Sequence, residues 1–230
     1  HTDPPQGVLG RFMSRDPIGF SGSSLNLYAY PTNPVTFTDP LGLQGRRGLN
    51  TDDAGTFSDA LGLLTRLAGG TGHTKYRNAA VSLSGLDKSG YVRINDPLVT
   101  DLGETRRGLQ IGDHGINLKS SLFFNGSFQR LCEFPEQRFD RAVLAAGVLF
   151  HENWHWNNWS NYSSREPAAW QQELDFYRDL LLFEMKEGGC QSRLDTIWQI
   201  GSDRLAAGRQ AGHVPTAPHF FDYRSQVLGL

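Results

Sequence analysis

Apolar side chains recur at the spacing of an α-helix in four stretches of the chain. The first stretch, TFSDALGLLTRLAGG, ends in the glycine pair Gly69 and Gly70 and predicts one amphipathic helix. Three more helices are expected toward the carboxyl end. Their ranges are about 135–157, 164–186 and 192–209.

Short segments with the composition of β-strands lie between the first helix and the other three. They are YVRIN (91–95), LQIGD (109–113) and INLKSSLFF (116–124). The last two are expected to pair as a hairpin across residues 114–115. The final 18 residues, HVPTAPHFFDYRSQVLGL, predict an extended segment that drapes over the domain. This order of elements predicts an α+β fold with a small sheet.

The amino-terminal residues have a different composition. Residues 1–43 are dense in Gly, Pro, Asn, Ser and aromatic residues, which predicts a short β-rich or irregular fragment. Residues 44–55, QGRRGLNTDDAG, have the polar, glycine-bearing composition of a linker. We therefore expect a fragment at 1–43, a linker at 44–55 and one domain at 56–230.

Composition and charge narrow the classes of function. The 230 residues are 38% apolar, enough for a hydrophobic core, and the formal net charge is -2. Without a basic excess, nucleic acid is not an expected partner. The longest apolar run, Ala142–Phe150, has nine residues where a membrane span needs about 20, so no membrane anchor is expected. Cys132 and Cys190 are the only cysteines, and one disulfide or two buried thiols would both fit them.

The strongest chemical signal is the stretch LFHENWHWNNWS, which contains an H-E-x-x-H motif. In a helix, His151 and His155 lie one above the other and can direct both rings at one zinc ion. Glu152 is rotated by about 100° around the helix axis, where it flanks the metal and can take a proton from water. The alternative is a core stripe in which the histidines continue the positions of Leu144 and Val148. We favour zinc, because chance rarely produces the motif and burying two imidazoles and a carboxylate without partners is costly.

A catalytic zinc ion needs a third protein ligand and keeps one position open. If NNWSNYSS is the turn of an antiparallel helix hairpin, His155 faces about residue 166. Glu166 then lies beside the metal and is the favoured third ligand. Glu173, opposite residue 148 and a full turn beyond, is the second choice, and Asp175 is a more distant one.

These residues resemble the zincin metallopeptidases. In the metzincin branch the motif continues with a glycine and a third histidine, but Asn158 and Asn161 occupy those positions here. The gluzincin branch takes a glutamate from the following helix, and E-P-A-A-W resembles the E-x-x-A start of that helix. The resemblance implies a zinc-dependent peptidase with the ligands and the base named above.

The zincin resemblance also implies a peptide substrate. In that family a strand edge beside the active-site helix holds the substrate in extended form through main-chain hydrogen bonds. INLKSSLFF is the strand that we expect in this role. A second hydrogen-bond donor usually stabilises the transition state. The sequence leaves the choice of this donor open among Tyr162, Tyr177, His213, His219 and Tyr223.

The segment Gly10–Leu43 contains GRF, SRDPIG, NLYAY, NPV and DPLGL. It closely resembles the end of the RHS repeat-associated core, which precedes variable toxin domains in bacterial polymorphic toxins. The resemblance implies that Asp16 and Asp39 form an intramolecular aspartic protease that cuts after Leu43, inside an RHS shell. Two carboxylates that share a proton can activate water in this way. Each Asp-Pro pair is also a common start of a turn.

The same resemblance implies a toxin that is secreted or injected into competitor bacteria or host cells. Its expected partners are a protein or peptide substrate in the target cell, a cognate immunity protein and the RHS shell. The rival interpretation is a non-peptidase toxin, a nuclease or a domain that blocks its target, in which the motif is structural. The low net charge and the segment GGTGHTK, which lacks the ending of a P-loop, argue against a nuclease. A third interpretation is that the whole chain is a structural piece of an RHS protein. The organised domain predicted after residue 55 argues against it.

Overall fold

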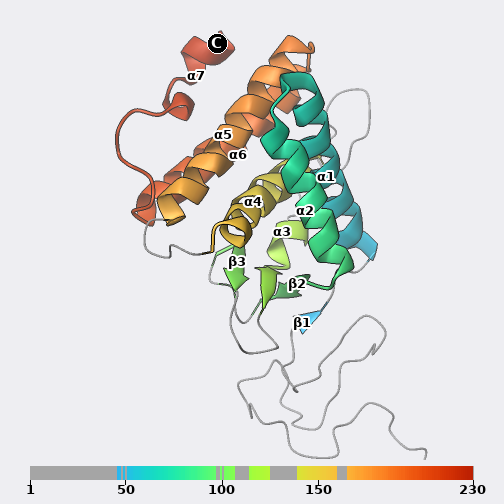
Figure 1. Cartoon of the computed structure of the whole chain (residues 1–230). Coiled ribbons are helices and arrows are strands. Elements are labelled where there is room, and N and C mark those ends of the chain that lie inside the picture. The colour runs from blue at the N-terminus through green and yellow to red at the C-terminus, as the bar shows by residue number, and fades with distance from the viewer. Residues whose placement is uncertain are drawn as a thin grey trace, which may run out of the picture.

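The computed structural model describes most of the chain after residue 45 (Figure 1). The predicted RHS fragment, with Asp16, Asp39 and Leu43, lies outside the described residues, as do Cys132 and the expected strand 109–113. The described residues are 46–47, 49, 51–96, 99, 101–106, 114–124, 139–159 and 165–229.

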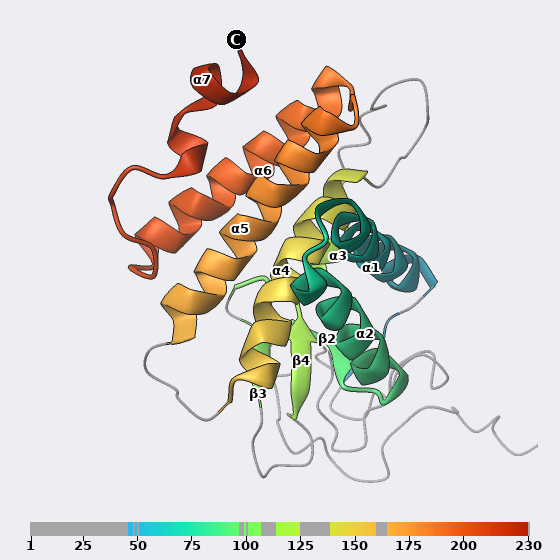
Figure 2. The same ribbon diagram turned by 45° about the horizontal axis from the view of Figure 1, so that its top comes forward.

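The fold is α+β, with a helical layer packed on a small sheet (Figures 1 and 2). The strands are β1 (Arg46–Arg47), β2 (Val92–Asn95), β3 (Gly103–Arg106) and β4 (Gly115–Leu118). The helices are α1 (Thr51–Thr71), α2 (Thr74–Lys88), α3 (Ser121–Phe124), α4 (Phe139–Asn157), α5 (Arg165–Lys186), α6 (Gln191–Gln210), the 3-10 helix η3 (Phe220–Asp222) and α7 (Arg224–Leu228).

The four helices expected from the apolar pattern are present as α1, α4, α5 and α6. Helix α1 begins at Thr51, and β1 pairs with β2, so much of the expected linker 44–55 belongs to the folded domain. Helix α2 was not predicted from the sequence. Its buried side chains nevertheless have helical spacing: Tyr76, Ala79, Ala80, Leu83 and Leu86.

The strand order is β1-β2-β4-β3, in which β2 and β4 are parallel and β3 is antiparallel to β4. The expectation that INLKSSLFF is one strand at a sheet edge is wrong. Its first half lies in β4, a central strand between β2 and β3 that is buried at every position, and its second half contains helix α3. The edge strands are β1 and β3, and β3 is the one that contacts α4; its sequence, GETR, has no apolar residue and gave no signal.

Helix α4 lies at the centre, where it contacts the sheet on one side and α1, α5 and α6 on others (Figure 2). It pairs with α5 in antiparallel order, since Gly147 meets Tyr177 and His155 meets Glu166. A Cβ added to Gly147 would lie 2.0 Å from the Tyr177 hydroxyl oxygen. The helices can therefore approach closely at this point only because residue 147 has no side chain.

The carboxyl-terminal segment returns along α6 (Figure 1). It is less extended than expected, because it contains η3 and α7. Arg209 of α6 pairs with Asp222 at 2.8 Å, and Arg224 pairs with Asp195 of α6 at the same distance. Phe221 is buried against α6. These contacts fix the chain that follows α6.

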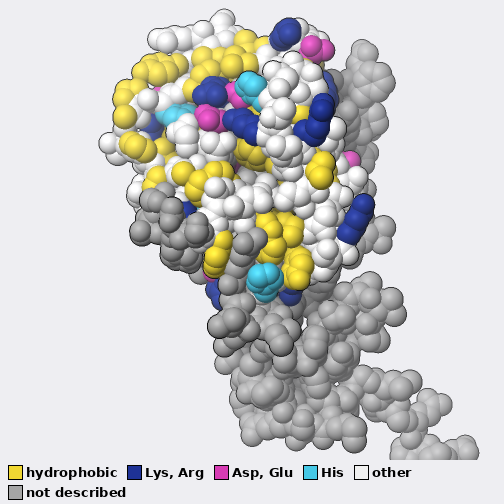
Figure 3. Space-filling view, in the orientation of Figure 1, with side chains coloured by type: hydrophobic (Ala, Val, Ile, Leu, Met, Phe, Trp, Pro, Cys, Tyr) yellow, Lys and Arg dark blue, Asp and Glu magenta, His cyan; other side chains and the backbone are white. Residues whose placement is uncertain are grey.

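Charged side chains of both signs are interspersed with histidines over the upper part of the face seen in Figure 3. Hydrophobic side chains form separate groups on that face. None of the helices in the described part of the chain is both long and apolar enough to cross a membrane.

Replacing Gly147 by alanine should destabilise the protein by about 1–3 kcal/mol, because the new methyl group overlaps Tyr177. Gly62→Ala is the matched control: a Cβ there meets nothing within 4 Å, so the change should raise stability by about 0.5–1 kcal/mol. Denaturant unfolding of both variants measures the difference. Equal effects would show that the α4–α5 approach does not depend on the glycine.

Candidate metal centre

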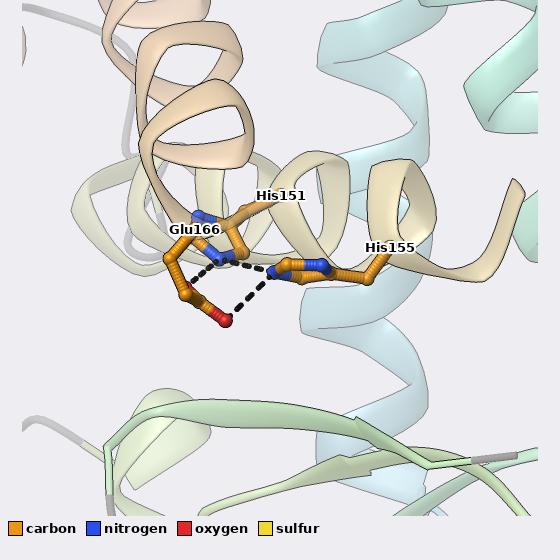
Figure 4. Close-up of side chains that lie close together, drawn as sticks. All are labelled: His151, His155 and Glu166. Atoms are coloured by element: carbon orange, nitrogen blue, oxygen red, sulfur yellow. Dashed lines mark hydrogen bonds and ion pairs between the residues drawn. The ribbon is translucent and has the colours of Figure 1, made fainter. Parts of the chain in front are cut away.

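Three side chains predicted as metal ligands converge where α4 meets the start of α5 (Figure 4). His151 and His155 lie one helical turn apart on α4, and their Nε2 atoms are 3.1 Å from each other. Glu166, in the first turn of α5, places one carboxylate oxygen 3.5 Å from His151 Nε2 and the other 3.2 Å from His155 Nε2. The two histidines are buried, and the Glu166 side chain is 46% exposed.

The spacing of these donor atoms fits one small divalent metal ion. Nitrogen and oxygen ligands about 2.0–2.1 Å from a tetrahedral ion lie roughly 3.3 Å from one another. The observed separations of 3.1, 3.2 and 3.5 Å scatter about that value. His151, His155 and Glu166 could therefore hold a metal ion and leave its fourth position open.

The electrostatics of the three residues also favour a cation. Burial opposes protonation of His151, but hydrogen bonds to Glu166 and Glu173 raise its pKa to about 10. Hydrogen bonds from His151 and His155 hold the pKa of Glu166 well below its usual range. These shifts favour a positive charge between the three side chains, and a metal ion would compete with the proton of His151 for the same nitrogen.

Glu173, the second choice for third ligand, lies on the far side of His151. Its Oε2 is 3.1 Å from His151 Nδ1, and it is not part of the cluster of possible ligands. Burial favours the neutral form of Glu173, yet Arg204 and His151 lower its pKa to about 2. Because an ionised carboxylate only accepts hydrogen bonds, His151 Nδ1 carries the proton and its Nε2 faces the metal position. Glu173 thus orients the ring of His151, a candidate ligand.

Arg204 of α6 completes this buried chain of contacts. Its Nε donates to Glu173 Oε1 at 2.6 Å and its Nη2 lies 3.2 Å from Oε2. The guanidinium also lies 3.5 Å from Asp101 and 4.4 Å from the centre of the Trp170 ring. Tyr177 donates to Glu173 at 3.2 Å. The group that orients His151 is itself fixed by two other side chains.

Glu152 points toward β3. Thr105 Oγ1 lies 2.8 Å from Glu152 Oε2 and 3.0 Å from the Glu152 main-chain oxygen, and its single proton can be donated to one of them at a time. A Cβ on Gly103 would approach within 2.9 Å of the Glu152 side chain, so glycine leaves room for the carboxylate. Burial raises the pKa of Glu152, which suits a proton acceptor.

A cavity of about 560 Å³ opens beside these residues. Of the candidates for a second donor, His213 lines it and stacks on Trp170 with ring centres 6.5 Å apart. Tyr177 is fully buried behind Glu173, and Tyr162 lies outside the described residues. The described residues that line the cavity are Asp101, Gly103, Glu104, Thr105, Val148, His151, Glu152, His155, Trp159, Arg165, Glu166, Trp170, Arg204, Ala207, Gln210, Ala211 and His213.

Strand β3 turns a free edge toward this cavity. Lys119 N donates to the carbonyl of Leu102, so this opposed pair is hydrogen-bonded. Pairs alternate along an antiparallel ladder, so Gly103 and Thr105 direct their N–H and C=O groups away from β4. Within the described part of the chain, β3 has no strand on that side.

Several residues of the site could not be found from the sequence. Thr105 and Arg204 reach the centre from elements distant along the chain, and neither belongs to a local motif. Glu173 was predicted as an alternative third ligand, whereas in the structure it contacts the Nδ1 atom of His151. His213 was one of five candidates for the donor, and the cavity distinguishes it from Tyr177.

The substitution Glu166→Gln should remove most of the metal affinity, because the site loses a negatively charged oxygen ligand. The substitution Glu173→Gln should lower the metal affinity by about 10–100-fold, because His151 is less well oriented although the three candidate ligands remain. Competition with a chromophoric chelator measures both variants. The reverse order would make Glu173 the third ligand.

Comparison with known proteins gives partial matches. No protein-family model matches the chain, and no solved structure does. The chain is 38% identical over 88 residues to "Double-stranded DNA deaminase toxin A" of Burkholderia cenocepacia (strain H111), a match that covers 31% of this chain and 6% of that protein. It is 54% identical over 43 residues to "Putative uncharacterized protein YlbH" of Escherichia coli (strain K12), covering 19% of this chain and 16% of that protein. The chain therefore spans a small part of each of these relatives.

Proposed function

We propose that this chain carries a zinc-dependent, zincin-like peptidase domain of a bacterial toxin. The observation that supports this most is the convergence of His151, His155 and Glu166 on one position, with Glu152 beside it. Two imidazoles and one carboxylate with an open fourth position are a common ligand set of catalytic zinc. When bound, zinc would polarise a peptide carbonyl and lower the pKa of water toward neutrality.

Glu152 is the general base of this proposal. Thr105 holds one of its oxygens, so the other is available to take a proton from the attacking water. The same carboxyl group can then give the proton to the leaving amine. Burial raises its pKa, which makes the carboxylate a stronger base for the first proton transfer and lets the carboxyl group hold the proton until the amine leaves.

The substrate of this proposal is an extended peptide that adds to the edge of β3. Gly103 and Thr105 supply the main-chain groups for this pairing, and they lie directly beside Glu152. A peptide held there passes the three candidate ligands through the cavity. His213, which follows the end of α6 and lines the same cavity, would donate a hydrogen bond to the developing oxyanion.

The toxin context rests on two observations. One relative is named as a toxin, and the segment Gly10–Leu43 resembles the end of an RHS core. We propose that Asp16 and Asp39 release the domain by cutting after Leu43. Such a cut would keep β1 within the product, where it pairs with β2. Delivery into target cells, an enclosing RHS shell and a cognate immunity protein belong to the same proposal.

The deaminase activity in the relative's name is not carried to this chain. Zinc deaminases use an H-x-E motif and a P-C-x-x-C motif. This sequence has no H-x-E, and its two cysteines are at positions 132 and 190. The residues that meet in the cavity support hydrolysis of a peptide instead.

Glu152→Gln should keep the metal and lose at least about 99% of peptide hydrolysis, because the general base is removed. Toxicity on expression in bacteria should be lost with it. Zinc content, hydrolysis of a quenched peptide library and growth are the measurements, and Glu104→Gln, also on the cavity wall, is the matched control. Toxicity that persists in Glu152→Gln, or deamination of double-stranded DNA by the parent protein, would contradict a peptidase.

His213→Ala should lower kcat by about 100-fold with KM little changed, because the donor acts on charge that develops during the reaction. His219→Ala is the matched control, since His219 is not among the described residues that line the cavity. Steady-state kinetics on one peptide compare them. A rise in KM alone would assign His213 to ordinary substrate binding.

A further inference from the structure

A second cavity lies next to the metal cavity, between α3, the start of α4 and α6. Its volume is about 780 Å³, within the range of small-ligand pockets. The described residues that line it are Leu102, Leu122, Asp140, Arg141, Leu144, Ser192, Asp195, Thr196, Gln199, Ile200, Asp203, Arg204, Ala207 and Arg224.

The two cavities are neighbours, and both border the segment that leads into strand β3. Arg204 and Ala207 line both of them. Leu102 lines the second cavity, and Gly103, the next residue, lines the first. A peptide that pairs with β3 and continues beyond Gly103 therefore brings its next side chains to the second cavity.

Two of the three arginines that line the second cavity form ion pairs with carboxylates of the protein. Arg204 pairs with Glu173, which is buried behind the wall, and Arg224 pairs with Asp195 at 2.8 Å. The guanidinium of Arg141 donates to a main-chain carbonyl of α3 at 3.0 Å. The arginines in this wall are thus held by the protein itself.

Two carboxylates in the same wall accept hydrogen bonds from neutral groups of the protein. Asp140 accepts from the main-chain N–H of Arg141, and Asp203 accepts from the side-chain amide of Gln199 at 2.8 Å. Among the residues that the structure describes, neither forms an ion pair. Both carboxylates can therefore accept hydrogen bonds from a cation that enters the cavity.

The remaining wall is apolar, with Leu102, Leu122, Leu144 and Ile200. A cavity with leucine and isoleucine walls and carboxylates suits a side chain that has an aliphatic stem and a cationic head. Lysine and arginine have this form. A neutral apolar side chain would fill the walls and leave the two carboxylates without a positively charged partner.

We propose that the second cavity is the subsite for a lysine or arginine of the substrate, close to the bond that is cut. This inference rests on the proposed peptidase function and names the class of peptide that the enzyme selects. Asp140 and Asp203 are the specificity-determining residues. They take no part in metal binding or in proton transfer.

The test measures binding separately from hydrolysis. The zinc-loaded full chain carrying Glu152→Gln is titrated with fluorescent peptides that differ at one position, scanned along the peptide, between lysine and its uncharged analogue norleucine. At one position of the scan, the lysine peptide should bind about three- to tenfold more tightly than the norleucine peptide. The preference should disappear when Asp140→Asn and Asp203→Asn are added, and it should survive Asp59→Asn, an exposed aspartate on α1.

The outcomes separate this inference from the proposed function. Equal binding of lysine and norleucine peptides at every position overturns the subsite, even if the parent enzyme hydrolyses peptides. A preference that survives the double variant overturns the assignment to Asp140 and Asp203. A lysine preference without hydrolysis by the parent enzyme supports the subsite and contradicts the peptidase. Zinc content and thermal unfolding of each variant show that the compared proteins are folded and loaded.

Discussion

The buried contact among His151, Glu173 and Arg204 is the interaction on which the site depends. It joins α4, α5 and α6, and each partner would be costly without the others. Burying a carboxylate or a guanidinium alone costs several kcal/mol, whereas the pair with good geometry offsets most of this. The contact therefore fixes which faces of the three helices meet. That choice places Glu166 at the open end of the α4–α5 pair, where its side chain reaches both histidines.

The same arrangement divides the acidic residues of the centre into different environments. Glu173 is enclosed and ionised because it has Arg204 and His151 as partners. Glu152 is equally enclosed, but its nearest hydrogen-bond donor is the neutral hydroxyl of Thr105, and burial raises its pKa. Glu166 is partly open to solvent. One carboxylate can thus orient a ligand, another can exchange protons and the third can bind a cation.

The sequence predicted the parts of the structure that depend on local pattern. The long helices followed from apolar spacing, and His151, Glu152 and His155 followed from one motif on one helix. The choice between Glu166 and Glu173 was harder, because residues seven apart lie on nearly the same face of a helix. Their positions relative to His151 depend on how closely α4 and α5 approach, which Gly147 and Tyr177 decide. Strand β3 could not be predicted, because GETR has no apolar alternation and is held by β4 and α4.

The contacts of Glu152 and of the metal ligands differ in how much chain must be ordered to make them. The three candidate ligands fall within residues 151–166, whereas the contact of Glu152 with Thr105 spans 47 positions. Closing the longer loop costs about 1 kcal/mol more in chain entropy, before the cost of ordering the sheet is counted. During folding, the helix pair can therefore assemble before β3 reaches it. A chain that folds in this order would bring its three candidate metal ligands together first, and would place Glu152 against Thr105 only when β3 has joined them.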